Sequence, residues 1–133
     1  MTNAVTTDTV TTDTEHNLCG RILQTAAKYA DRICLESADG MALVYGDLDR
    51  LTARFANALA AAGVEKGDRV AVQVEKSAPV VTLYLACLRL GAVYLPLNTA
   101  YTLNELDYFI GDAEPALVVC DPDREAVLKK RVG

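Results

Sequence analysis

The sequence has 133 residues, which limits it to one domain. Its residues are 51% apolar and 23% charged, and its formal net charge is −5, which is the ordinary composition of a soluble globular chain. The acidic balance and the scattered basic residues argue against a nucleic-acid partner, because phosphate binding requires clustered Lys and Arg. The longest apolar stretch, residues 78–90, is too short to span a bilayer, so we expect no membrane partner.

The first residues form a low-complexity segment in which the sequence Val-Thr-Thr-Asp-Thr occurs at 5–9 and again at 10–14. Such a segment has too little apolar surface to offset the entropy lost on ordering, so we expect residues 1–16 to be a disordered Thr-rich tail. The first basic residue is Arg21, which leaves no positively charged start for a targeting peptide.

Four cysteines are present, and none belongs to a C-x-x-C pair. The single histidine, His16, has no second ligand type near it, so the sequence lacks zinc-site spacing. Three of the thiols lie inside apolar runs, where a free cysteine behaves as a small hydrophobic residue; these are Cys34, Cys87 and Cys120. This usage fits a reducing, cytoplasmic location.

Apolar residues at four-residue spacing predict a helix over residues 17–29. Two short strands follow, at 33–37 and 41–45, joined by the turn residues Ala38-Asp39-Gly40, and together they predict a β-hairpin. A long helix is expected over 47–62, with an apolar stripe formed by Leu48, Leu51, Phe55 and Leu59. Gly63 should end this helix in a left-handed conformation.

The second half alternates strands and helices. Strands are expected at 69–74, 92–95 and 116–120, with Pro96 stopping the second. The helix at 78–90 is apolar nearly all round, so it should be buried on more than one side; Ser77 is its expected N-cap and Pro79 lies in its first turn.

Thr102 and Glu105 have the spacing of a capping box, which predicts a helix from Leu103 to about Asp112. A last helix should begin at Asp121-Pro122. Apolar strands separated by helices indicate parallel βαβ units. The fold class is therefore α/β, with a β-hairpin and a long helix ahead of parallel βαβ units.

Neither classical phosphate-binding motif, G-x-G-x-x-G or G-x-x-x-x-G-K-[ST], occurs in the sequence. Neither of its two serines lies in G-x-S-x-G. Asp107 and Asp112 fit exposed helix positions better than a paired catalytic site. Asp121 and Asp123 follow the carboxyl end of a strand, where α/β proteins bind ligands, but Asp-Pro-Asp is also an ordinary helix start, and we favour Asp121 as a cap.

Four aromatic residues in the second half could form a base-stacking platform. They are Tyr94, Tyr101, Tyr108 and Phe109. Because no basic groove accompanies them, core packing is the favoured interpretation. From the residues alone, the sequence indicates a soluble α/β domain without a visible active site, and we assign no catalytic, cofactor-binding or metal-binding residue.

Two stretches carry a resemblance. Residues 43–48 and 63–71 read LVYGDL and GVEKGDRVA, and residues 85–98 read LACLRLGAVYLPLN. They resemble the first two core motifs of the adenylate-forming superfamily, which includes acyl-CoA synthetases, peptide-synthetase adenylation domains and luciferases. Within it, residues 94–110, continuing into 112–115, resemble the malonyl-CoA synthetases. Asp47 replaces the usual glutamate, and Arg89-Leu90 replaces a common Lys-Ala pair.

The resemblance implies that residues 17–133 are a partial N-terminal subdomain of such an enzyme. Family members make an acyl-adenylate from an acid and Mg-ATP, and coenzyme A then displaces AMP. The family's phosphate loop, ribose-binding aspartate and catalytic lysine have no counterpart here, so we expect this chain to be inactive alone. For the longer enzyme, the resemblance implies ATP, Mg²⁺, coenzyme A, and malonate or a similar short dicarboxylate.

A second hypothesis is a non-catalytic interaction module, or a truncated gene product that associates with a partner chain. The apolar helix at 78–90 and the strand at 116–120 would then leave apolar surface exposed, through which the chain could associate with itself or with another chain.

Overall fold

The computed structural model describes residues 16–132. The tail expected over residues 1–16 therefore lies outside the described residues, except for His16. The first helix, α2 (Leu18–Ala26), continues into the 3₁₀ turn η1 (Ala27–Tyr29). Asn17 begins α2, and its Oδ1 accepts a hydrogen bond from the Gly20 N–H at 3.3 Å. Asn17 Nδ2 also donates to the carbonyl of Leu88, 2.7 Å away and 71 positions along the chain.

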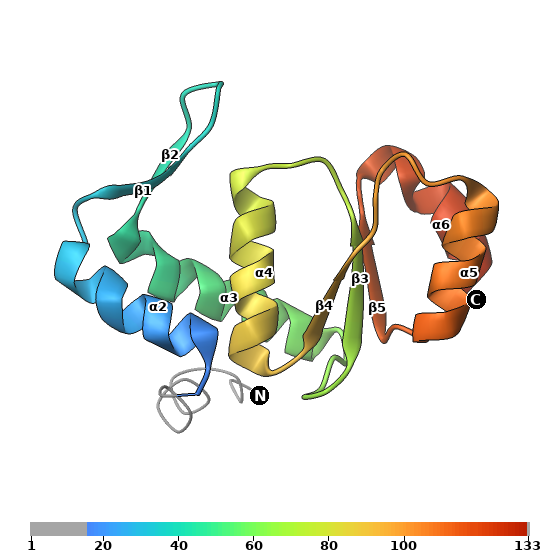
Figure 1. Cartoon of the computed structure of the whole chain (residues 1–133), viewed down its shortest axis with the longest axis horizontal. Helices are drawn as coiled ribbons and strands as arrows, with labels where there is room; N and C mark the ends of the chain where they lie inside the picture. The colour runs from blue at the N-terminus through green and yellow to red at the C-terminus, as the bar shows by residue number, and fades with distance from the viewer. Residues whose placement is uncertain (1–15, 133) are drawn as a thin grey trace.

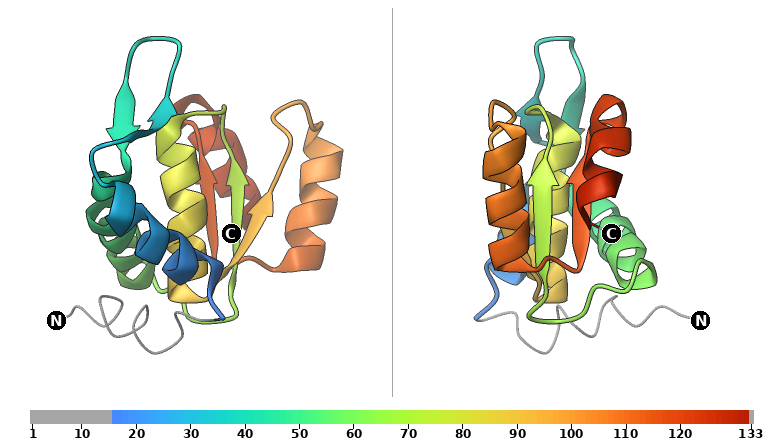
Figure 2. Two further views of the ribbon diagram at one scale, coloured as in Figure 1. Left: turned by 60° about the vertical axis from the view of Figure 1, so that its left-hand side comes forward. Right: turned by 90° about the vertical axis from the view of Figure 1, so that its right-hand side faces the viewer.

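The predicted hairpin is confirmed. Strands β1 (Ile33–Glu36) and β2 (Ala42–Val44) pair antiparallel, with a register shift between Ile33 and Leu35. The hairpin extends away from the helices that follow it (Figures 1 and 2). Its chain then enters a second 3₁₀ turn, η2 (Tyr45–Asp47), where the Asp47 carboxylate accepts from the Val44 N–H at 3.3 Å.

The long helix is α3 (Leu48–Ala61), and Gly63 has φ +93° just beyond its end, as expected. The predicted apolar stripe is right only in part. Leu48 and Leu59 are buried, but the other fully buried side chains of α3 are Thr52 and Ala56. The larger Leu51 and Phe55 are half-buried at the sides of the stripe, because α3 packs closely against the next helix and small residues line that contact.

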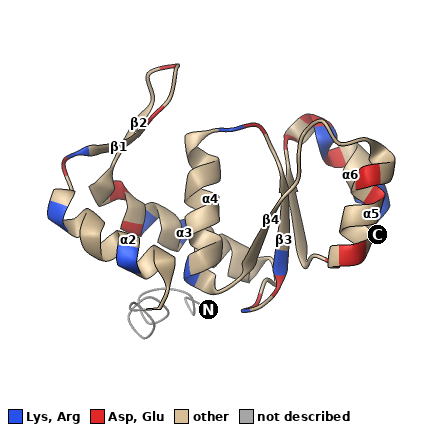
Figure 3. Cartoon of the chain, in the orientation of Figure 1, with Lys and Arg blue, Asp and Glu red and all other residues tan. Residues whose placement is uncertain are grey.

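That next helix is α4 (Ala78–Leu90), which has the predicted bounds. It packs against α3 and α2 on one side and against the sheet on another, and its only charged residue is Arg89 (Figure 3). Burial on more than one side is thus confirmed. Ser77 occupies the N-cap position, but its hydroxyl makes no capping hydrogen bond, so its predicted capping role is wrong. Gly91 ends the helix at φ +83°.

The parallel sheet has strand order β4-β3-β5. Its strands are β3 (Arg69–Gln73), β4 (Val93–Pro96) and β5 (Leu117–Cys120), and both pairings are parallel, as predicted. Pro96 does not stop β4 but is its last residue. The amide of Val93 donates to the carbonyl of Asp68, just before β3, and that of Leu97 donates to Val72 of β3. The nitrogen of Pro96 therefore faces the open side of this edge strand, where proline is tolerated.

Helices cover both faces of the sheet (Figures 1 and 2). Val70 and Val72 of β3 pack with α3 and α4 in one core cluster. Ala71 packs on the other face with α5 (Leu103–Ala113) and α6 (Glu125–Val132). The capping box of α5 is confirmed: Thr102 Oγ1 accepts from the Glu105 N–H at 3.3 Å, and Glu105 Oε2 accepts from the Thr102 N–H at 2.7 Å.

The last helix begins later than predicted. Asp121-Pro122 opens a 3₁₀ turn, η3 (Pro122–Arg124), and α6 follows from Glu125. None of the helices within residues 16–132 is long and apolar enough to cross a membrane.

Candidate functional site

The carboxyl end of the parallel sheet is the candidate site, because α/β proteins bind ligands beyond the carboxyl ends of their strands. Strand β3 ends at Gln73, β4 at Pro96 and β5 at Cys120. The register pairs Gln73 with Cys120 and Val72 with Pro96, so the three strands end at nearly the same level. The loops that leave them are therefore neighbours, and hydrogen bonds between polar residues link them in pairs.

Gln73 joins the first two loops. Its side chain is 1% exposed, and Nε2 donates to the carbonyl of Asn98 at 2.9 Å. Asn98 in turn accepts from the Ala100 N–H with Oδ1, at 2.9 Å. Gln73 Oε1 is buried and has no hydrogen-bond partner among residues 16–132. The sequence analysis did not single out Gln73, although a polar residue at the end of an otherwise apolar strand could have indicated it.

Asp121 joins the loops that follow β3 and β5. Its Oδ2 accepts from the backbone N–H of Glu75 at 3.1 Å, across 46 positions of the chain. Asp121 stands at the N-cap position of η3, but its side chain makes no capping hydrogen bond there. The predicted capping role is therefore wrong, because the Asp121 carboxylate accepts the long-range hydrogen bond from the Glu75 N–H instead. Asp123 lies exposed within η3 and does not share this contact.

A hollow of about 230 Å³ opens at this end of the sheet, between α3, α4 and the β3–α4 loop. Its lining is mainly apolar, with polar groups from Glu75, Ser77 and Asp121. Its two charged residues are both acidic, which is the wrong sign for a phosphate group. The hydrogen bonds here fix the loops to one another, and no Lys, Arg or His is among the described residues that line the hollow.

The other carboxylate candidates do not form a site. Asp107 on α5 forms an ion pair with Arg131 on α6, with 2.6 Å between Oδ1 and Nε, and Asp112 is exposed. The interpretation of both as exposed helix positions is confirmed. Throughout the part of the chain that the structure describes, no three His, Cys, Asp or Glu side chains gather as a metal site would require.

The aromatic residues pack in pairs. Tyr94 meets Tyr84 edge-on, and Tyr101 stacks on Phe109 with ring centroids 5.0 Å apart. Core packing is confirmed for Tyr94, Tyr101 and Phe109, which are half-buried. It is wrong for Tyr108, which touches Phe109 but is 66% exposed, because its position on α5 faces away from the sheet.

Arg89 is a second buried polar residue that sequence reasoning missed. It is 3% exposed, and its NH1 group donates to the carbonyl of Asp49 at 2.9 Å, to Asp49 Oδ1 at 2.8 Å and to Thr52 Oγ1 at 3.0 Å. All three acceptors belong to α3, so Arg89 fastens α4 to α3. A lone charge in an otherwise apolar helix was the available signal.

The buried thiols are not activated nucleophiles. Burial raises the pKa of Cys19 to about 11, an effect that the nearby Arg89 charge opposes, and burial also raises the pKa of Cys87 to about 11. The pKa values of Cys34 and Cys120 are raised as well, chiefly by burial. All four thiols are free. Reactive cysteines have lowered pKa values, so these are packing residues, as predicted for Cys34, Cys87 and Cys120.

Comparison with known proteins gives one consistent result. The AMP-binding enzyme family matches residues 22–132. A feruloyl-CoA synthase of Amycolatopsis is 39% identical over 63% of this chain and 17% of its own length. An oxalate–CoA ligase of Arabidopsis thaliana is 31% identical over 87% of this chain and 24% of its own.

Solved structures agree with this match. MatB from Rhodopseudomonas palustris, solved both without ligand and with ATP bound, superposes with a TM-score of 0.82 at 47% identity. The superposition covers 87% of this chain and 23% of MatB. A fatty acyl CoA synthetase of Mycobacterium tuberculosis gives 0.81 at 26% identity. The chain thus spans about a quarter or less of the length of these relatives.

Proposed function

Because this chain belongs to the AMP-binding enzyme family, we propose that it is the N-terminal scaffold of an ATP-dependent acid–CoA ligase. The observation that carries the proposal is the agreement with MatB in both sequence and fold, at 47% identity and a TM-score of 0.82. The matched region contains the hairpin, α3, α4 and the parallel sheet. Its conspicuous interactions, at Gln73, Arg89 and Asp121, hold these elements together.

For the substrate, we propose malonate or a similar short dicarboxylate. Two observations support this choice. The segment from Tyr94 to Pro115 resembles the malonyl-CoA synthetases, and the identity to MatB, 47%, exceeds the 26% to the fatty acyl CoA synthetase of Mycobacterium tuberculosis.

The four free thiols support a reducing, cytoplasmic location for the protein.

Enzymes of this family use ATP, Mg²⁺ and coenzyme A. The described residues do not fit ATP at the candidate site, because the charged groups around its hollow are Glu75 and Asp121, which repel phosphate oxygens. Phosphoryl chemistry instead requires oriented donors and a cation around the phosphates. We therefore propose that the chain of residues 1–133 does not activate an acid by itself, and we derive no chemical step through ATP here.

A chimera tests the scaffold role directly. The segment of Rhodopseudomonas palustris MatB that superposes on this chain is replaced by residues 17–132, and ATP–pyrophosphate exchange is measured with malonate. We expect exchange within about tenfold of the parent enzyme, since the scaffold supplies no reacting group. A well-folded chimera without exchange would refute the role. The matched control carries Arg89→Ala in the grafted segment and should lose thermal stability before it loses exchange.

The isolated chain provides the complementary test. Purified residues 1–133 are assayed for ATP–pyrophosphate exchange with malonate, and ATP binding is measured by calorimetry. We expect neither exchange nor saturable binding. Robust exchange would refute the proposal that this chain is inactive alone. Saturable ATP binding without exchange would indicate a nucleotide-binding domain of another kind.

A further inference from the structure

A hollow of about 690 Å³ lies between α2, η1 and the residues that flank the β1–β2 hairpin. Its apolar lining includes Leu18, Ile22 and Tyr45, and the large side chains of Leu18 and Tyr29 are 51% and 44% exposed. Helix α2 stands at the end of the molecule opposite α6 (Figure 1). The hollow is therefore built from residues 18–45, far from the last described helix.

Backbone hydrogen bonds fix the two walls of the hollow to each other. The Tyr45 N–H donates to the Arg32 carbonyl, and the Gly46 N–H donates to the Ala30 carbonyl, both at 2.9 Å. A Cβ atom on Gly46 would lie 3.1 Å from the Ala30 oxygen, so this close approach suits a residue without a side chain. The fold itself therefore sets the shape of the hollow.

The hollow is positively charged, although the net charge of the chain is −5. Among the described residues, the only charged ones that line it are Arg21 and Arg32. The Arg32 guanidinium lies over the Tyr29 ring, 4.8 Å from the ring centroid. This stacking orients the guanidinium and leaves the N–H groups at its edge free to donate.

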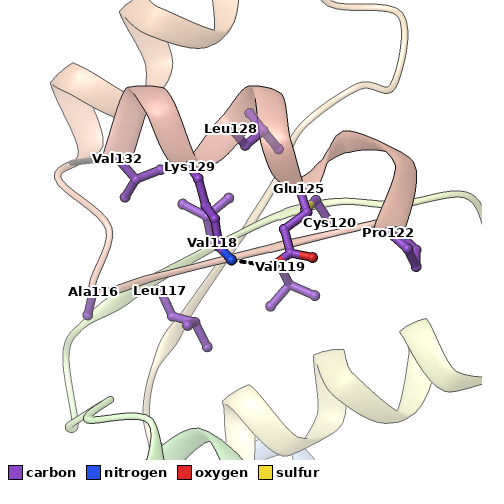
Figure 4. A pocket seen from close by; sticks show the side chains of 10 residues that line it. All are labelled: Ala116, Leu117, Val118, Val119, Cys120, Pro122, Glu125, Leu128, Lys129 and Val132. Atoms are coloured by element: carbon purple, nitrogen blue, oxygen red, sulfur yellow. Dashed lines mark ion pairs between the residues drawn. The ribbon is translucent and has the colours of Figure 1, made fainter.

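Neither guanidinium has an acidic partner within residues 16–132, since the ion pairs there involve other arginines and a lysine. The groove between β5 and α6 is different, because its charged residues, Glu125 and Lys129, already pair with each other (Figure 4). The hollow beside α2 therefore suits an acidic occupant, since guanidinium–carboxylate hydrogen bonds are among the stronger ones in proteins.

The segment that precedes α2 has this chemistry. Residues 1–20 contain three acidic residues, Asp8, Asp13 and Glu15, and no Lys or Arg. The repeated sequence Val-Thr-Thr-Asp-Thr, at 5–9 and 10–14, supplies one valine and one aspartate in each copy. We call residues 5–15 the acidic segment. Its valines match the apolar lining of the hollow, and its aspartates match the two guanidiniums.

The acidic segment is also attached next to the hollow. The Asn17 side chain bonds to the Gly20 N–H and to the Leu88 carbonyl, which fixes this point of the chain, and Leu18 lines the hollow. Ten residues reach at most about 35 Å, whereas residues 18–29 span about 20 Å of helix. Because the segment is tethered, its effective concentration is about millimolar, so individually weak contacts suffice.

We propose that the acidic segment binds in this hollow, where the carboxylates of Asp8 and Asp13 accept hydrogen bonds from the guanidiniums of Arg21 and Arg32. The segment is too polar to form a core of its own, and binding supplies the contacts that order it. The match to the AMP-binding enzyme family begins only at residue 22. The contact thus goes beyond the proposed ligase role and does not depend on it.

Zero-length cross-linking of the 133-residue chain tests the contact. Arg32→Lys keeps the positive charge and introduces an amine, which a carbodiimide joins to a carboxylate in direct contact. We expect an amide between position 32 and Asp8 or Asp13, identified by mass spectrometry. The matched control is Arg50→Lys, at an exposed arginine that does not line the hollow. Its cross-link to either aspartate should be at least about fivefold weaker, because only the hollow holds the segment close.

Peptide competition gives a second measurement. A synthetic peptide of residues 3–15 is titrated into the full chain, in which the native acidic segment already occupies the hollow. The variant Asp8→Asn/Asp13→Asn frees the hollow and should bind the peptide at least about tenfold more tightly than the native chain. Adding Arg21→Gln/Arg32→Gln to that variant should abolish the gain. Circular dichroism of each variant should match the native chain, because exposed charges contribute little to stability.

Three results would overturn the proposal. One is a cross-link at position 32 no stronger than that at position 50, and another is equal peptide affinity for the native chain and Asp8→Asn/Asp13→Asn. The third comes from a folded MatB chimera that carries residues 1–132, where the cross-link from Arg32→Lys should persist. Its absence there would show that another part of the longer enzyme fills the hollow.

Discussion

The guanidinium of Arg89 lies 2.8 Å from the carboxylate of Asp49 and joins α4 to α3. The two ends of this ion pair differ sharply in exposure: the Arg89 side chain is 4% exposed and that of Asp49 is 76%. Because the carboxylate remains solvated, only the arginine has been desolvated, and its hydrogen bonds to Thr52 and to the Asp49 carbonyl offset that cost.

Replacing Arg89 with alanine should therefore destabilise the chain by about 2–4 kcal/mol, because it removes three hydrogen bonds and leaves a cavity between helices. Arg89→Met, which keeps most of the volume and carries no charge, should cost less. Urea unfolding measures both. The control is Arg50→Ala, since the Arg50–Asp47 pair is exposed, and it should change the free energy of unfolding by less than about 1 kcal/mol. Equal losses for Arg89→Ala and Arg50→Ala would contradict this account.

Stability should fall in alkaline solution because of the buried thiols. The folded-state pKa of Cys19 and of Cys87 is about 11, against an ordinary value of 9.0. Between these values the unfolded chain loses protons that the folded chain keeps, so the unfolded state is favoured as pH rises. Each thiol should cost about 1–3 kcal/mol by pH 11. Thermal unfolding from pH 8 to pH 10.5 measures the decline, and Cys87→Ala should flatten it.

The capping box of α5 should contribute measurably. Thr102→Ala removes the oxygen that accepts from the Glu105 N–H, and we expect a loss of about 1 kcal/mol in the free energy of unfolding. Thr25→Ala is the matched control, because Thr25 is an exposed residue inside α2 whose hydroxyl bonds only to the Arg21 carbonyl of the preceding turn. That change should be close to neutral. A similar loss at both positions would show that the cap is not the source.

Two glycines should respond oppositely to alanine. Gly91 has φ +83°, and a Cβ atom there would lie 2.9 Å from Lys66 Cγ, so Gly91→Ala should destabilise by about 1–2 kcal/mol. Gly111 lies within α5 with no atom within 4 Å of an added Cβ, so Gly111→Ala should stabilise by about 0.5–1 kcal/mol. Differential scanning calorimetry of the pair tests the signs, and a loss at both sites would contradict the assignment.

The sequence predicted most of the secondary structure, because the relevant signals are local. Each signal lies within a few residues of the element that it predicts. Examples are the Thr102–Glu105 spacing, the turn at Gly40 and the glycines after α3 and α4. The parallel sheet was also predictable, since three apolar strands alternate with helices. Ser77 and Asp121 show the limit of this reasoning: a residue suited to capping is free to bond elsewhere, and Asp121 bonds to Glu75 across the sheet.

The candidate site was less predictable for the same reason. Gln73 acquires its role only when β4 is placed beside β3, and Arg89 acquires its role only when α3 lies against α4. Each polar residue stands out in the sequence, but its partner does not, because the fold brings together residues 25 and 40 positions apart. The family resemblance, by contrast, was readable directly from the motifs, and the match to AMP-binding enzymes over residues 22–132 confirms it.

The hydrogen bond from Asn17 to the Leu88 carbonyl sets an order of events during folding. Helix α2 is the first described helix to be synthesised, yet the same asparagine that begins it is also held by the last turn of α4, 71 positions later. Contacts between residues this distant form late, because the chain between them must first be ordered. We therefore expect α2 to dock only after α3, α4 and the sheet have assembled, so that the first helix within residues 16–132 to be synthesised is the last to be secured.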